Sequence, residues 1–79
     1  MIVYLTCGPR LALYLDPNID AATRKVEVEG SPTLHEILAD LGVPEGLFAY
    51  GVIGERFVKL DYHPSSGEHV RLEVPVGGG

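Results

Sequence analysis

Hydrophobic and polar residues alternate in short stretches of the chain, and this period of two predicts β-strands. The alternation is clear at residues 24–29 and again at residues 69–74. Residues 1–7 are β-branched and aromatic, which also favours a strand. We expect one face of the two alternating strands to point toward the core, and that face carries Val26, Val28, Val70, Leu72 and Val74.

Between these strands, one stretch has the spacing of an amphipathic helix. Thr33 and Glu36 form a capping-box pattern that predicts the helix start. Gly42 suits the left-handed position just after a helix, and Pro44 cannot continue one. The predicted apolar face of this helix consists of Leu34, Ile37, Leu38 and Leu41.

The remaining segments predict a hairpin and two connections. Residues 47–53 and 56–60 read as strands joined by a tight turn at Gly54-Glu55. Residues 61–68 are rich in turn-forming residues and predict a loop. Residues 10–15 are apolar, and their pattern fits either an extension of the first strand or a short helical turn.

This order of elements predicts an α+β fold, in which one helix buries its apolar stripe against a sheet. We expect a mixed sheet of four to five strands packed on one main helix, in a single domain that spans residues 1–75. Residues 76–79 form a separate short tail in this prediction.

The amino-acid composition and net charge exclude some classes of function. The net charge is −5, which argues against nucleic-acid binding. No apolar run approaches the length of a membrane span, and no signal peptide is evident. The single cysteine, Cys7, fits a reducing, cytoplasmic location, and we expect its thiol to be buried and inert.

No set of residues predicts a self-contained enzyme or a metal site. The histidines, His35, His63 and His69, lack the spacing of metal ligands, and we expect solvated surface positions for them. The carboxylates are spread over outward positions and form no inward pair of the kind that acid–base catalysis uses.

The chemistry therefore depends on the last residues. Pro75 ends the preceding strand, and Gly77, Gly78 and Gly79 lose much backbone freedom on ordering, so we expect a flexible tail. A tail without side chains fits a narrow channel in another protein, and its reactive group is the carboxylate of Gly79. That carboxylate is a poor electrophile until a partner activates it.

The chain resembles the ubiquitin-like sulfur carriers of molybdopterin and thiamine biosynthesis, the MoaD/ThiS family. The resemblance covers residues 26–79 and depends most on the strand, the proline and the closing Gly-Gly at matching spacing. Its motifs are Thr33-Leu34-His35-Glu36-Ile37-Leu38, Leu41-Gly42-Val43-Pro44, Val52-Ile53-Gly54-Glu55, Ser66-Gly67-Glu68 and Val74-Pro75-Val76-Gly77-Gly78-Gly79. The resemblance implies a β-grasp, ubiquitin-like fold.

The resemblance also implies a mechanism and partners. An E1-like adenylyltransferase uses ATP to adenylate Gly79, a persulfide enzyme donates sulfur, and the thiocarboxylate then passes it to the large subunit of a synthase. No cofactor is bound by the carrier itself. The longer spacer between the first two strands favours the molybdopterin type over the thiamine type. The partner-binding residues expected from this reading are Phe57, Val58, Leu72, Val74, Pro75 and Val76.

Two other functions fit the same sequence. The first is a ubiquitin-like modifier that is joined to other proteins through Gly79. The second is a β-grasp binding module whose glycine tail has no chemical role. Isopeptide-linked adducts would distinguish the modifier, and an activity that survives removal of Gly78 and Gly79 would distinguish the binding module.

Overall fold

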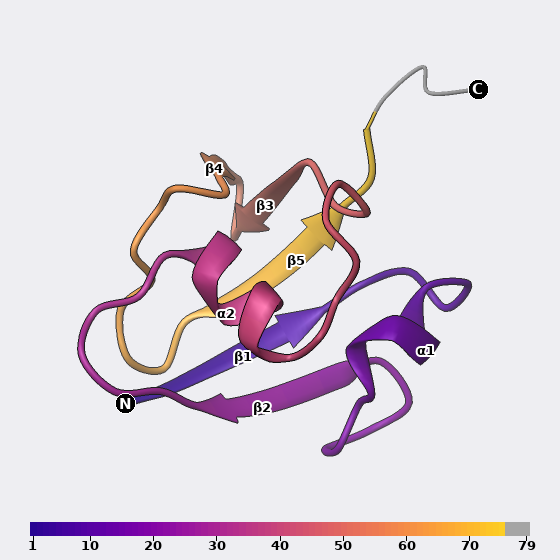
Figure 1. The fold of residues 1–79 in the computed structure, drawn as a ribbon, viewed down its shortest axis with the longest axis horizontal. Helices are drawn as coiled ribbons and strands as arrows, with labels where there is room; N and C mark the ends of the chain where they lie inside the picture. Colours follow the sequence, from indigo (N-terminus) through magenta and orange to yellow (C-terminus); the bar gives the residue numbers. More distant parts are fainter. Residues whose placement is uncertain (76–79) are drawn as a thin grey trace.

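Five strands pair into one mixed sheet in the computed structural model, which describes residues 1–75 (Figure 1). They are β1 (Ile2–Thr6), β2 (Thr23–Glu27), β3 (Tyr50–Ile53), β4 (Arg56–Lys59) and β5 (His69–Glu73). Two helices, α1 (Ala12–Leu15) and α2 (Leu34–Asp40), complete the regular structure of these residues. The strand order is β2-β1-β5-β3-β4, with β1 and β5 parallel at the centre and all other neighbours antiparallel. The predicted α+β class with a mixed sheet is confirmed.

The two faces of the sheet differ because successive side chains in a strand point to opposite sides. One face, the inner face, packs against α2 and forms the core. Leu34, Ile37 and Leu38 of α2 are buried there. The strands contribute Val3, Leu5, Val58, Val70 and Leu72 to the same buried cluster. The opposite, outer face carries the polar and aromatic residues of the strands.

Helix α2 begins and ends as its sequence predicts. Thr33 Oγ1 accepts the backbone N–H of Glu36, and Glu36 Oε1 accepts the backbone N–H of Thr33, which completes a capping box. Gly42 follows the helix with a φ of +80°. The N–H groups of Gly42 and Val43 bond Ala39 O and Leu38 O, so two of the last free carbonyls of α2 are satisfied.

The ambiguous stretch at residues 10–15 is helical. Helix α1 closes the end of the core beside β1 and β2, and its Leu15 is fully buried. Cys7 is also buried, as predicted. These two residues extend the core beyond the strands.

Three strand predictions are wrong in extent. Strand β2 ends at Glu27 rather than at residue 29. Strand β3 begins at Tyr50 rather than at residue 47, because Phe48 inserts into the core from an irregular segment. Val74 does not share the buried face of Val70 and Leu72. Strand β5 stops at Glu73, whose carbonyl accepts the N–H of Ala49, and the Val74 side chain is 45% exposed.

The loop at residues 61–68 places β5 beside β1. The N–H of Gly67 bonds Ile2 O, and the N–H of Tyr4 bonds Glu68 O. Inside the loop, Glu68 Oε1 accepts both the Tyr62 hydroxyl and the N–H of Ser65. The Glu68 carboxylate raises the pKa of the Tyr62 hydroxyl above its usual value, so this phenol stays protonated as a donor.

Candidate functional site

The candidate site begins where β5 leaves the sheet. Strand β5 lies between β1 and β3, so the residues that follow it are anchored by the centre of the sheet. Val74 and Pro75 follow β5 and are exposed. The predicted tail residues Val76, Gly77, Gly78 and Gly79 lie outside the described residues. The described structure therefore shows where the tail is attached, at the end of β5.

The structure divides the predicted partner-binding residues into two groups. Phe57 is 71% exposed, and Val74 and Pro75 are exposed beyond β5. Val58 and Leu72 instead face α2 in the core, where they are 8% and 2% exposed. Because their side chains are covered, we correct their assignment from partner contacts to core residues.

Phe57 and Tyr50 form an aromatic strip on the outer face. Phe57 lies opposite Val52 in the β3–β4 pair, and its ring centroid is 5.4 Å from that of Tyr50. Arg71 of β5 lies on the other side of Val52, and Arg71 Nε contacts Glu73 Oε2 at 3.3 Å. Val52 is buried beneath these neighbours although it is not part of the main core. An exposed aromatic residue beside a covered Val52 suits contact with a protein surface.

A second feature at the base of the tail is a groove that sequence reasoning missed. It runs between β5 and the segment that joins β1 to α1, and its lining includes Cys7, Arg10, Leu11, Tyr14, Arg71 and Val74. These residues are far apart in sequence. They meet because β1 and β5 are parallel, so their carboxyl ends reach the same edge of the sheet. The groove could have been predicted from the sequence only if the parallel pairing of β1 and β5 had been recognised.

Cys7 in this groove does not have the properties of a nucleophile. Its side chain is 6% exposed, and burial raises the pKa of its thiol. A raised pKa keeps the sulfur protonated near neutral pH, whereas a reactive cysteine needs a thiolate. The expectation of a buried thiol is confirmed. Cys7 therefore gives the groove no reactive sulfur.

The histidines are dispersed over the surface. His35 Nε2 is 2.9 Å from Glu45 Oε1, His63 Nδ1 is 2.6 Å from Ser31 O, and the His69 ring stacks on Tyr4 with centroids 4.3 Å apart. Within residues 1–75, no three metal-ligating side chains come together. The described part of the chain thus provides no metal centre.

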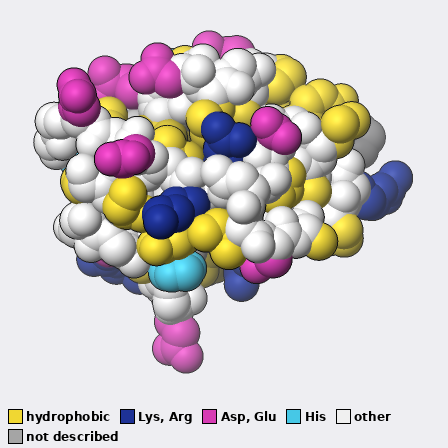
Figure 2. Space-filling model, turned by 90° about the horizontal axis from the view of Figure 1, so that it is seen from below, with side chains coloured by type: hydrophobic (Ala, Val, Ile, Leu, Met, Phe, Trp, Pro, Cys, Tyr) yellow, Lys and Arg dark blue, Asp and Glu magenta, His cyan; other side chains and the backbone are white. Residues whose placement is uncertain are grey.

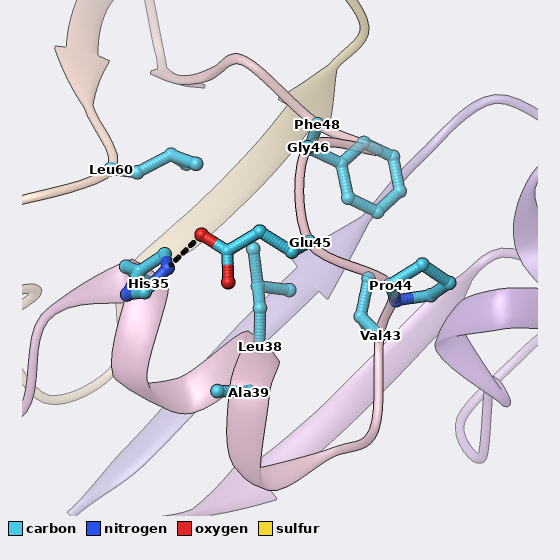
Figure 3. Close-up of a pocket in the computed structure, with 9 residues that line it drawn as sticks. All are labelled: His35, Leu38, Ala39, Val43, Pro44, Glu45, Gly46, Phe48 and Leu60. Carbon is cyan, nitrogen blue, oxygen red and sulfur yellow. Dashed lines mark hydrogen bonds and ion pairs between the residues drawn. The ribbon is translucent and has the colours of Figure 1, made fainter.

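The cavity next to His35 is too small for an organic ligand. It lies between α2 and the segment that follows it, and the His35–Glu45 pair closes one side (Figure 3). Its space is about 30 Å³, enough for a water molecule but not for a substrate. The carboxyl group of Glu45 points across its mouth toward His35 (Figure 3).

Comparisons of this chain with protein-family models, curated proteins and solved structures find no match. Among the residues that the structure describes, no helix combines the length and apolar character that crossing a bilayer requires. Any function must therefore be inferred from the sequence of the tail and from the fold to which the tail is attached.

Proposed function

We propose that this protein is a ubiquitin-like sulfur carrier that delivers sulfur as a thiocarboxylate at Gly79. The observation that carries this proposal is the position of the glycine run, which follows the central strand β5 after only Val74, Pro75 and Val76. A tail that starts at the centre of a five-stranded sheet has a rigid base. Its glycines offer no side chain that would block entry into a narrow active site.

The architecture supports a β-grasp assignment. The strand order β2-β1-β5-β3-β4 places two parallel strands at the centre, and α2 lies in the long crossover between the two antiparallel pairs. One helix covers one face of the sheet, as the ubiquitin-like reading expects. The outer face remains available for partners, and Phe57 is its most exposed large hydrophobic residue.

The chemistry follows from the carboxylate at Gly79. An E1-like adenylyltransferase would join this carboxylate to the AMP of ATP and release pyrophosphate. The terminal sulfur of a persulfide enzyme would then attack the acyl-adenylate, release AMP, and leave a thiocarboxylate after thiol cleavage of the S–S bond. The large subunit of a synthase would take the sulfur, for a dithiolene in the molybdopterin pathway. The carrier acts as a co-substrate in this scheme and binds no cofactor of its own.

The intact mass of the protein purified from the cells that produce it tests this proposal. We expect a species that is heavier by the difference between sulfur and oxygen, with the change located to the C-terminal peptide. Removal of Gly79 should abolish it. An unmodified mass after incubation with ATP, an E1-like enzyme and a sulfur donor would contradict the carrier function. Isopeptide adducts through Gly79 would instead identify a modifier.

A further inference from the structure

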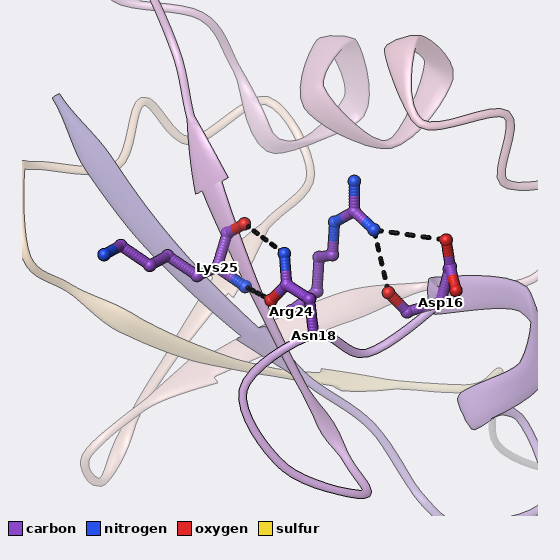
Figure 4. Close-up of polar contacts among 4 residues, drawn as sticks. All are labelled: Asp16, Asn18, Arg24 and Lys25. Atoms are coloured by element: carbon purple, nitrogen blue, oxygen red, sulfur yellow. Dashed lines mark hydrogen bonds and ion pairs between the residues drawn. The ribbon is translucent and has the colours of Figure 1, made fainter.

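The exposed edge of β2 is closed over half of its length by a side chain. Asn18 Oδ1 accepts the backbone N–H of Lys25 at 2.7 Å, and Asn18 Nδ2 donates to the backbone carbonyl of Lys25 at 3.1 Å (Figure 4). Thr23 O accepts the N–H groups of Asn18 and Ile19. The amide of Asn18 thus takes the place of a neighbouring strand. Such protection is one way in which proteins prevent unwanted pairing at a sheet edge.

The other half of the same edge is open. The N–H and carbonyl groups of Val28 pair with Met1, so in this antiparallel ladder the alternate residue Glu27 directs its own N–H and carbonyl away from β1. Neither backbone group of Glu27 has a hydrogen-bond partner within residues 1–75. Strand β2 is the outermost strand of the sheet on this side (Figure 1). An added strand would find a donor and an acceptor here.

Beside this open edge lies a groove between β2 and α2 with an apolar floor. Val26 and Val28 are partly buried on the inner face, and Leu41 at the end of α2 faces them across the groove. Pro32 and Ile37 complete the floor. Alternate side chains of a strand added at Glu27 would point into this groove, because neighbouring strands place their paired residues on the same face.

The rim of the open half is acidic. Glu27, Glu29 and Asp40 line the groove, whereas its two cations, Arg24 and Lys25, lie at the half that Asn18 closes. Arg24 is also paired with Asp16 at 3.3 Å (Figure 4). Seen from the side of β2, Asp and Glu side chains gather at the upper left of the surface, and hydrophobic side chains lie among them (Figure 2). The open half therefore combines carboxylates with exposed apolar surface.

We propose that the edge of β2 at Glu27, together with the β2–α2 groove, binds an extended peptide segment of another protein in which apolar and basic residues alternate. The apolar residues would pack on Val26 and Val28, and the basic residues would lie opposite Glu27 and Glu29. The same carboxylates oppose pairing of two copies of this chain at the edge, because like charges would face each other. The proposal does not depend on the tail or on its chemistry.

Titration of the ¹⁵N-labelled full chain with the peptide acetyl-Lys-Val-Lys-Val-Lys-amide tests this site by NMR. We expect saturable shifts centred on the amides of Glu27, Val28, Glu29 and Leu41, and binding at least tenfold weaker for acetyl-Glu-Val-Glu-Val-Glu-amide. Shifts elsewhere, equal binding of both peptides, or no localised shift at millimolar peptide would overturn the proposal. Peptide-independent dimerisation through β2 would also overturn it.

Two variants separate backbone pairing from charge attraction. Glu27→Pro removes the outward N–H without disturbing the ladder with β1, a position at which edge strands tolerate proline. We expect it to weaken binding tenfold or more while the variant stays folded by its amide spectrum. Glu29→Lys reverses one of the carboxylates that the basic residues would face but changes no backbone group of Glu27, and it should weaken binding of the Lys peptide and strengthen binding of the Glu peptide. Unchanged affinities in both variants would show that the peptide binds elsewhere.

Discussion

Gly51 lies so close to Val70 on the inner face of the sheet that a Cβ on Gly51 would be 2.6 Å from Val70 Cγ1. Val58 Cγ2 and Leu34 Cδ1 would lie 3.3 Å and 3.4 Å from the same Cβ. The absence of a side chain at position 51 therefore lets α2, β4 and β5 pack against one point of β3. The tightest of these three contacts is with Val70 of β5.

Substitution Gly51→Ala should consequently destabilise the fold. The added methyl must displace the Val70 side chain in a packed core, and overpacking of this kind costs about 1–3 kcal/mol in the free energy of unfolding. Urea denaturation measures the loss. Gly8→Ala is the matched control, because nothing lies within 4 Å of a Cβ at Gly8. Equal free energies of unfolding for Gly51→Ala and the wild type would show that the core accommodates the added methyl group.

The helix and the main strands could be predicted because their signals are local. The capping box at Thr33 and the turn at Gly42 depend on residues within one helical turn, and both are present. The choice between strand and helix at residues 10–15 depended on tertiary packing, which buries Leu15 beside β1 and β2. The close contact at Gly51 could not be predicted for the same reason, since the residues around it come from elements that are distant in the sequence.

At the candidate site, the exposure or burial of the predicted residues could be inferred from the sequence only in part. Sequence reasoning could not separate Phe57 from Val58, because adjacent strand residues point to opposite faces and the direction of the helix relative to β4 was unknown. It missed the groove beside Arg10, which needs the parallel pairing of β1 and β5. The chemistry of the tail, which lies outside the described residues, remains a prediction.

Leu72 and Phe57 should respond oppositely to truncation. Leu72→Ala removes a side chain that is 2% exposed, and we expect a loss of about 2–5 kcal/mol in the free energy of unfolding. Phe57→Ala removes a side chain that is 71% exposed, so stability should change by no more than about 0.5 kcal/mol. Thermal denaturation of both variants checks this difference. A large loss for Phe57→Ala would show that the outer aromatic strip supports the fold.

Glu36 should make stability depend on pH in the acidic range. The backbone N–H of Thr33 bonds its carboxylate and lowers its pKa below the usual value of 4.5. A lowered pKa in the folded state stabilises the protein above the unfolded value, and this contribution disappears as the pH falls through the folded pKa. The wild type should be more stable than Glu36→Gln at pH 6, and the two should converge below pH 4.5. A constant difference between pH 6 and pH 3 would contradict this role.

Cys7 should react with thiol reagents only when the structure opens. Its burial and the raised pKa of its thiol both suppress the thiolate that attacks such reagents. We expect native protein at pH 7.5 to react with Ellman's reagent at least about a hundredfold more slowly than protein in denaturant. Introduction of Leu72→Ala should accelerate the native reaction, since it favours open states. Fast labelling of the native wild type would identify Cys7 as an accessible thiol.

The side-chain amide of Asn18 closes half of the β2 edge through two hydrogen bonds to Lys25. Asn18→Ala removes both hydrogen bonds to Lys25, and a typical net contribution of about 0.5–1.5 kcal/mol per bond predicts several-fold faster hydrogen exchange at the Lys25 amide. Asn18→Asp retains an acceptor for that N–H but loses the donor to the Lys25 carbonyl, so the Lys25 amide should stay protected. Native-state exchange by NMR distinguishes the two variants, with the amide of Val26 as an internal reference because it pairs with β1. If Asn18→Ala left exchange at Lys25 unchanged, the side-chain amide would not be what closes this half of the edge.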